Sequence, residues 1–248
     1  MPETTTPTTW SPFSYVVTNL ARFVRPGEVT FSGVNSTLPM MACLLAKRAY
    51  DFDFTYINVA GGVDPEPHRA PISSSDPVLT LGSASIFANE DFYDLCCRGG
   101  MDLCFLGAAQ IDGQGRTNVS SIGPWDKPKV RLPGGGGGAV MLPTARRSVT
   151  WRTEHSTRTL VEQLDFVTAA GGMHGLVTPL GVFQLVDGRM TLMSHHPDVI
   201  AGQVAERTGF AVDAEGVPPT AAPTAAETAA LRALDPDGTF EADAGVRL

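Results

Sequence analysis

The sequence predicts an α/β protein built on an open, mostly parallel sheet. Three observations support this class. Strand and helix signals alternate over most of the 248 residues, several short apolar runs end in loops, and there is neither an internal repeat nor a second regime of composition. We therefore expect a single folded domain over residues 12–248.

The N-terminal part predicts a strand followed by a capped helix. Residues 1–11 are rich in Thr and Pro, and we expect a disordered tail. A helix is expected over Tyr15–Val24, before a Pro-Gly pair, and a strand over Glu28–Val34. Asn35-Ser36-Thr37 offers capping side chains to a second helix over Leu38–Tyr50.

Apolar and β-branched runs mark the strands that follow. Phe54–Ala60 ends at a Gly pair, and Leu103–Ala108 leads to a loop at Asp112–Gly115, which suits buried strands of a parallel sheet. Further strands are expected over Val149–Trp151, Leu164–Thr168, Val177–Thr178 and Val182–Val186. Residues 217–228, rich in Pro, Ala and Thr, predict a surface connection to a short helix over Glu227–Leu234.

Charge and composition narrow the classes of partner. A net charge of −8 supplies no clustered positive field for nucleic acid or an anionic membrane. The N-terminus lacks the features of a signal peptide, and no apolar run is long enough to span a membrane, so we expect a cytoplasmic protein. The four cysteines show neither zinc-site nor disulfide-scaffold spacing, and we interpret them as buried thiols.

The clearest local motif is Pro133 followed by five glycines, Gly134–Gly138. Without Cβ atoms, backbone N–H groups can converge on an oxyanion or a phosphate. As an oxyanion hole, each such donor can lower a barrier by ~3 kcal/mol. The other interpretation is a flexible linker, because the spacing matches neither the Walker phosphate loop nor a G-x-G-x-x-G turn.

A second candidate site is Asp64-Pro65-Glu66-Pro67-His68, just beyond the Phe54–Ala60 strand. Ligands of open α/β sheets bind at the carboxyl ends of strands, where Glu66 and His68 can act as acid and base. The alternative is a solvated turn punctuated by prolines.

Basic, histidine and aromatic residues complete the candidates. Five basic residues flank the glycines: Lys127, Lys129, Arg131, Arg146 and Arg147. They can bind the phosphates of coenzyme A, keep a loop soluble, or contact a partner chain. His195-His196 lacks further ligands at metal-site spacing, so we expect no metal. Phe87, Phe92 and Tyr93 fit core positions at least as well as a pocket.

Taken together and in order, several stretches resemble the β subunit of class I coenzyme A transferases, especially the glutaconate CoA-transferase type. The resemblance runs from about residue 12 to 240, and the stretches are Tyr56–Asp64 (YINVAGGVD), Phe105–Gly123, Lys127–Ala139, Leu180–Phe183, His196-Pro197 through Phe210, and Leu234-Asp235-Pro236. It implies a three-layer α/β/α subunit with a central mixed, mostly parallel sheet. It also implies a homologous α subunit, in a heterodimer or an α2β2 heterotetramer, with the active site at the junction.

The family's nucleophile is a glutamate at the end of the strand that matches Phe54–Ala60. Aligning YINVAGGVD by its Gly and Asp places Val59 at that position, and sliding by one residue places Ala60 there. Neither side chain can attack a thioester, whereas a glutamate forms an acyl anhydride and then an enzyme-bound CoA thioester.

The glycine loop, in contrast, is retained. The resemblance implies that Gly136 and Gly137 hold the thioester carbonyl oxygen and that the acyl-CoA is bound by neighbouring residues: Gly134, Gly135, Gly138, Gln110, Asn118, Lys127 and Lys129. Coenzyme A is then part of the substrate, and no permanently bound cofactor is expected.

An oxyanion site without a nucleophile favours C–C chemistry: decarboxylation of a glutaconyl-type CoA, or cleavage of a C–C bond by water. Within the superfamily, the stretches GGVDPE, GRTNVSSIGPWDKPK and AERTGF look closer to 3-methylglutaconyl-CoA decarboxylases than to the steroid-ring-opening hydrolases. His68, Glu66 or a partner residue are the candidate proton donors. The alternatives are a genuine CoA transferase that uses Glu66, and a non-catalytic scaffold subunit.

Overall fold

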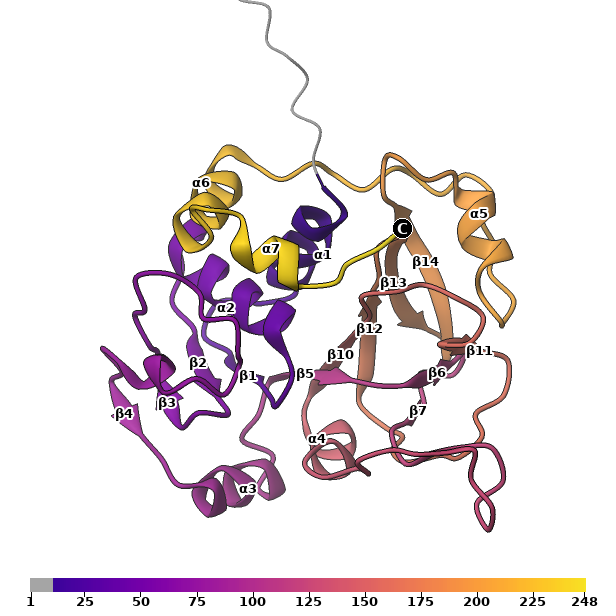
Figure 1. Cartoon of the computed structure of the whole chain (residues 1–248), viewed down its shortest axis with the longest axis horizontal. Coiled ribbons are helices and arrows are strands. Elements are labelled where there is room, and N and C mark those ends of the chain that lie inside the picture. The colour runs from indigo at the N-terminus through magenta and orange to yellow at the C-terminus, as the bar shows by residue number, and fades with distance from the viewer. Residues whose placement is uncertain (1–10) are drawn as a thin grey trace, which may run out of the picture.

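A nine-stranded sheet forms the centre of the molecule in the computed structural model, which describes residues 11–248 (Figure 1). β6, β7 and β11 form a separate three-stranded sheet, and β8 and β9 form a two-stranded one. The strands of all three sheets are β1 (Val29–Ser32), β2 (Thr55–Asn58), β3 (Gly62–Val63), β4 (Ser85–Ile86), β5 (Leu103–Gly107), β6 (Gln110–Asp112), β7 (Thr117–Asn118), β8 (Ser121–Ile122), β9 (Val130–Arg131), β10 (Arg147–Trp151), β11 (Leu160–Val161), β12 (Met173–Val177), β13 (Gly181–Val186) and β14 (Arg189–His195). The helices are α1 (Pro12–Ala21), α2 (Thr37–Ala49), the 3-10 helix η1 (Pro77–Thr80), α3 (Asn89–Cys97), α4 (Gly138–Thr144), α5 (Ala201–Glu206), α6 (Ala225–Leu234) and α7 (Thr239–Asp243).

The strand order of the large sheet is β14-β13-β12-β10-β5-β1-β2-β3-β4. The middle strands β12, β10, β5, β1 and β2 are parallel, and antiparallel strands extend the sheet at both edges. The chain leaves β1 for β2 on one side and then enters β5 on the other. A mixed, open α/β sheet was predicted, and the structure confirms it.

Helices cover both faces of this sheet. In β5, Leu103 and Phe105 pack in the cluster formed with α1, α2 and α6, whereas Cys104 and Leu106 pack in the cluster formed with α3 and α4. Figure 1 shows α3 and α4 on the opposite side of the sheet from α1 and α2. This alternation is what a strand buried on both faces requires.

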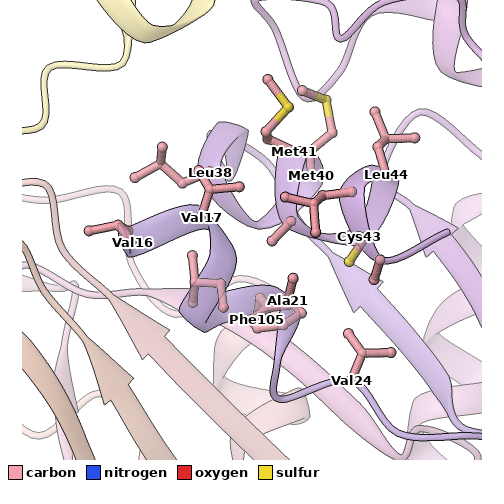
Figure 2. Packing of buried hydrophobic residues seen from close by; sticks show 14 of the residues in the cluster. Val16, Val17, Ala21, Val24, Leu38, Met40, Met41, Cys43, Leu44 and Phe105 are labelled. Atoms are coloured by element: carbon pink, nitrogen blue, oxygen red, sulfur yellow. The ribbon is translucent and has the colours of Figure 1, made fainter. Parts of the chain in front are cut away.

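The packing of α1 on α2 is shown in Figure 2. Val17 and Ala21 from α1 join Leu38 and Cys43 from α2 above Phe105 of the sheet, in one buried cluster. All five side chains are fully buried, so the first helical layer is fixed firmly over the parallel strands.

Helix starts depend on local capping that the apolar periodicity did not indicate. α1 begins at Pro12 rather than Tyr15, because the Ser11 hydroxyl accepts a hydrogen bond from the Ser14 amide at 3.2 Å. Ser11 is therefore ordered, which corrects part of the predicted 1–11 tail; residues 1–10 lie outside the described residues. Ser36 precedes α2, but its side chain makes no capping bond, so that prediction was wrong.

One strand prediction was wrong, and one long strand was not predicted. Leu164–Thr168 is irregular, because its polar groups bind the neighbouring loop instead of a strand. β14 was not predicted, although an Asp-Gly pair such as Asp187-Gly188 is typical of a two-residue hairpin turn. In the structure these two residues have φ of 49° and 77°, as a type I′ turn between β13 and β14 requires. The other predicted strands are present with ends shifted by a few residues.

The C-terminal segment returns to the first helical layer. Thr224 and Glu227 form a capping box at the start of α6. Glu227 also pairs with Arg22 at 2.8 Å although it is only 2% exposed. Beyond α7, the Arg247 amide donates to the Thr153 carbonyl at 2.9 Å, which brings the C-terminal residues to the end of β10.

Two further properties concern thiols and membranes. Cys43, Cys96 and Cys104 are buried, but Cys97 is exposed, so the prediction that all four thiols are buried was wrong for Cys97. Within residues 11–248, every helix is too short or too polar to cross a membrane.

Candidate active site

A cavity of about 830 Å³ lies at the carboxyl edge of the parallel strands. It is lined by the segments that directly follow β1, β2, β5 and β10, together with the glycine loop and parts of α3 and α7. The chain reverses its direction of winding between β1 and β5, and the crevice at such a switch point is where open α/β sheets bind ligands. The topology alone therefore selects this cavity as the candidate site.

The glycine loop forms one wall of the cavity, and all five of its glycines line it. Among the described residues, the amides of Gly136 and Gly137 donate no hydrogen bond to the protein. Gly136 has a φ of 44°, and a Cβ on Gly137 would lie 2.7 Å from Met141 Cε and 3.1 Å from Tyr93 Oη. This backbone can present two free N–H donors to an anionic oxygen only because side chains are absent.

A buried polar network supports the loop from behind. Asn118 Nδ2 donates to Gln110 Oε1 at 2.7 Å, and Gln110 Nε2 donates to Asp165 Oδ2 at 2.8 Å. The Asn118 backbone precedes Val119, whose carbonyl accepts from the Gly134 amide at 2.8 Å. Gln110 and Asn118, predicted to bind the substrate, do not line the cavity and instead position the glycine loop.

Val59 lies where the strand β2 ends and faces the cavity. Its amide donates to the Ser32 carbonyl at 3.2 Å, and the preceding Asn58 side chain fixes the turn by donating to the Gly62 carbonyl at 3.0 Å. Ala60 packs against the opposite cluster of the core and does not line the cavity. Of the two positions that the alignment left open, Val59 is the one that reaches the site.

The electrostatics of the cavity favour an anion. The first turn of α2, at Ser36 and Thr37, opens onto it, and Ser36 supplies no side-chain cap to the free amides. Positive helix ends and uncapped N–H groups stabilise negative charge. Among the described residues that line the cavity, the only carboxylate is Asp243, which is exposed on α7.

Several other candidates lie away from the cavity. Glu66 and His68 are exposed in the segment after β3, and Lys127 and Lys129 lie beside the β8–β9 hairpin, outside the cavity lining. The other basic residues also bind elsewhere: Arg131 lies 4.5 Å from the ring centroid of Trp125, Arg146 lies 3.3 Å from Asp102, and Arg147 lies 2.6 Å from Glu28.

Phe87, Phe92 and Tyr93 all line the cavity but differ in burial. Phe92 is 5% exposed and stacks on Phe31 with a centroid distance of 4.1 Å. Tyr93 is 41% exposed and, like Phe87, lines the cavity. Tyr93 therefore belongs to the site, with its hydroxyl beside Gly137.

Sequence reasoning missed Arg152 and Asp243, which line the cavity from the end of β10 and from α7. Burial lowers the pKa of Arg152 from its ordinary value, and its Nη1 donates to the Ala108 carbonyl at the end of β5. Asp243 reaches the cavity only because α6 and α7 fold back over the sheet. No local sequence signal marks either residue.

The buried histidines are structural. His155 bridges the hydroxyls of Thr178 and Thr208 at 2.8 and 2.9 Å, and burial lowers its pKa to about 4. His196 is 2% exposed and packs 5.0 Å from the ring centroid of Tyr15.

Comparison with known proteins gives the family. A family model described as "Coenzyme A transferase" matches residues 14–207, which is most of the chain. The chain belongs to the coenzyme A transferase family. Its site thus combines this family's fold with a valine at the end of β2.

Proteins similar to this chain are named for different reactions. The β-type subunit of the 3-oxoadipate CoA-transferase of Pseudomonas knackmussii is 35% identical, with 87% of this chain and 89% of the relative covered. The cholesterol ring-cleaving hydrolase IpdB subunit of Rhodococcus jostii is 32% identical, with 77% and 78% covered. Among solved structures, the decarboxylase AibA/AibB superposes with a TM-score of 0.88 at 36% identity, covering 95% of this chain and 99% of that one.

Proposed function

We propose that this chain is the β-type subunit of a two-subunit enzyme that decarboxylates a glutaconyl-type CoA thioester. The observation that carries the proposal is Val59, an alkyl side chain at the cavity position where a transferase needs its glutamate. The similarity to a decarboxylase supports this reaction, and the similarity to a ring-cleaving hydrolase supports chemistry other than CoA transfer. Overall identity does not decide the reaction, since it is 35% to a transferase subunit and 36% to the decarboxylase.

The proposed reaction begins with the thioester carbonyl oxygen at the amides of Gly136 and Gly137. The bond between the γ carbon and the departing carboxylate breaks, and CO₂ leaves. The electron pair delocalises through the conjugated double bond to the thioester oxygen, giving a dienolate. Donors aimed at that oxygen stabilise the transition state more than the ground state, because the negative charge on the oxygen increases along the reaction.

A proton must then be added to the dienolate carbon. One candidate proton donor is Tyr93, whose hydroxyl lies beside Gly137. Water and a residue of the partner subunit are the other candidates. Glu66 and His68 are not used in this proposal, because both lie outside the cavity lining. A partner subunit in this proposal is supported by relatives that are themselves named as subunits of larger enzymes.

The test is product analysis with the two-subunit enzyme, obtained by co-expression with the product of the neighbouring coding sequence. 3-Methylglutaconyl-CoA is incubated with and without acetate, and the products are identified by mass spectrometry. Loss of CO₂ with the CoA thioester intact supports the proposal. Free CoA together with the intact dicarboxylic acid would show hydrolysis of the thioester bond instead, and acetyl-CoA formed only with acetate would show a transferase.

A CoA transferase is the second candidate, because the transferase relative from Pseudomonas knackmussii is 35% identical. A transferase carries CoA as an enzyme-bound glutamyl thioester, which borohydride reduces. Treating the enzyme with acyl-CoA and borohydride, followed by peptide mass mapping, would detect this adduct. An adduct at Glu66 would establish the transferase, whereas an unmodified chain supports non-covalent chemistry.

A further inference from the structure

Arg152 is the only cationic side chain among the described residues that line the cavity. The chain has a net charge of −8, and carboxylates pair with Arg22, Arg146, Arg147 and Arg158. Arg152 makes no ion pair within residues 11–248 of the structure. Its nearest acidic neighbour in sequence, Glu154, is instead bound to Arg158 at 3.0 Å.

The guanidinium group of Arg152 is only partly satisfied. Nη1 donates to the Ala108 carbonyl, but Nε is shielded from solvent and has no hydrogen-bond partner among the described residues. Arg152 is half-buried, and a partly desolvated cation without a counter-charge gains from a carboxylate that binds the planar fork of its guanidinium.

Arg152 and the glycine loop face the same space from different elements. Arg152 follows β10, its Nη1 reaches the Ala108 carbonyl after β5, and Val59 follows β2, so the two residues enter the cavity from different strands. Ala109, the residue after Ala108, donates its amide to the Asn118 carbonyl at 2.9 Å, and the Gly134 amide donates to the Val119 carbonyl at 2.8 Å, so backbone hydrogen bonds connect the two walls. The arrangement provides a carbonyl site and a separate carboxylate site in one cavity.

We infer that Arg152 binds the free terminal carboxylate of the acyl group, so that the site selects CoA monothioesters of dicarboxylic acids. This inference deepens the proposed function and rests on it for the position of the thioester. It assigns Arg152 a role in specificity: a neutral acyl chain fills the same cavity but leaves the guanidinium unpaired. In a decarboxylation, the bound carboxylate loses its charge as CO₂ forms, so the interaction is mainly with the ground state.

The test compares binding of unreactive analogues to the two-subunit enzyme by calorimetry. Glutaryl-CoA and butyryl-CoA differ in the terminal carboxylate, and we expect the wild type to bind glutaryl-CoA about 10- to 100-fold more tightly. Arg152→Gln should remove this preference while leaving the affinity for butyryl-CoA unchanged. Arg158→Gln, a substitution of an exposed arginine six residues away, should retain the preference and is the matched control.

The outcomes separate this inference from the proposed function. Equal weakening of both analogues by Arg152→Gln would show that Arg152 binds the coenzyme or a partner residue and would overturn the inference. If the variant does not fold, the wild type can be measured with the neutral amide of glutaryl-CoA, and undiminished affinity for the amide would overturn it too. A wild type that prefers glutaryl-CoA but releases no CO₂ would retain the inference and reject the decarboxylase.

Discussion

Gly137→Ala should remove most of the activity by displacing an oxyanion donor. The new Cβ would lie 2.7 Å from Met141 Cε and 3.1 Å from Tyr93 Oη, whereas ordinary contacts of this kind begin near 3.4 Å. The end of the methionine can yield, but Tyr93 or the loop itself must also move by several tenths of an ångström. A loop shift that turns the Gly137 amide away from the oxyanion removes one donor, and the loss of one oxyanion donor costs about 100-fold in rate.

The assay is steady-state turnover of the assembled two-subunit enzyme, with circular dichroism to confirm folding. We expect kcat to fall about 100-fold while the affinity for CoA analogues changes little. The control is Gly202→Ala in α5, where a Cβ would have no neighbour within 4 Å and which lies outside the cavity lining. Unchanged kcat in Gly137→Ala would refute the oxyanion role and favour the scaffold interpretation.

Three further predictions concern the cavity, its support and the buried histidine. Val59→Glu should lower kcat at least about tenfold, because a carboxylate at this position repels the developing oxyanion. The neutral variant Val59→Gln should lower kcat less, and equal losses in the two variants would exclude a charge effect. Asn118→Ala removes the hydrogen bonds of its side chain to Gln110 Oε1, the Ser121 carbonyl and the Ser120 amide and should lower the free energy of unfolding in urea by about 3 kcal/mol together with the activity; a loss below about 1 kcal/mol would contradict the supporting role. Since the folded pKa of His155 is about 4, the unfolded chain binds the extra proton below its ordinary pKa of about 6.5, and His155 alone should lower the free energy of unfolding by about 3 kcal/mol between pH 7 and pH 4. His155→Gln should make that fall smaller, and an identical pH dependence would contradict it.

The sequence was most informative where the signal is local. The five glycines of the loop can be recognised without any structure, because few other requirements produce such a run, and the structure places them in the cavity wall. The Asp187-Gly188 pair and the alternating residues after it are equally local signals of β14. The sequence therefore contains enough information to predict this strand.

Other features depend on contacts between distant parts of the chain. Leu164–Thr168 has the composition of a strand, but its Thr168 hydroxyl accepts from the Val119 amide at 3.0 Å, and the segment supports a loop instead. Gln110 and Asn118 have the chemistry of binding residues, yet they are buried behind the glycine loop. Only the arrangement of the strands distinguishes a residue that lines a site from one that holds it in place.

Arg152 could not have been selected from the sequence for the same reason. It is one arginine among several in its region, and its significance comes from lying at the end of β10 beside the end of β5. The three-dimensional structure shows that it is the arginine that reaches the cavity.

The most direct test of the central claim is the initial rate of CO₂ release from 3-methylglutaconyl-CoA as a function of acetate concentration. Chemistry without a covalent intermediate predicts a finite rate at zero acetate and no dependence on acetate, with the CoA thioester intact in the product. A rate of CO₂ release that stays at zero, with acetyl-CoA formed in proportion to added acetate, would contradict the interpretation of Val59 and identify a transferase.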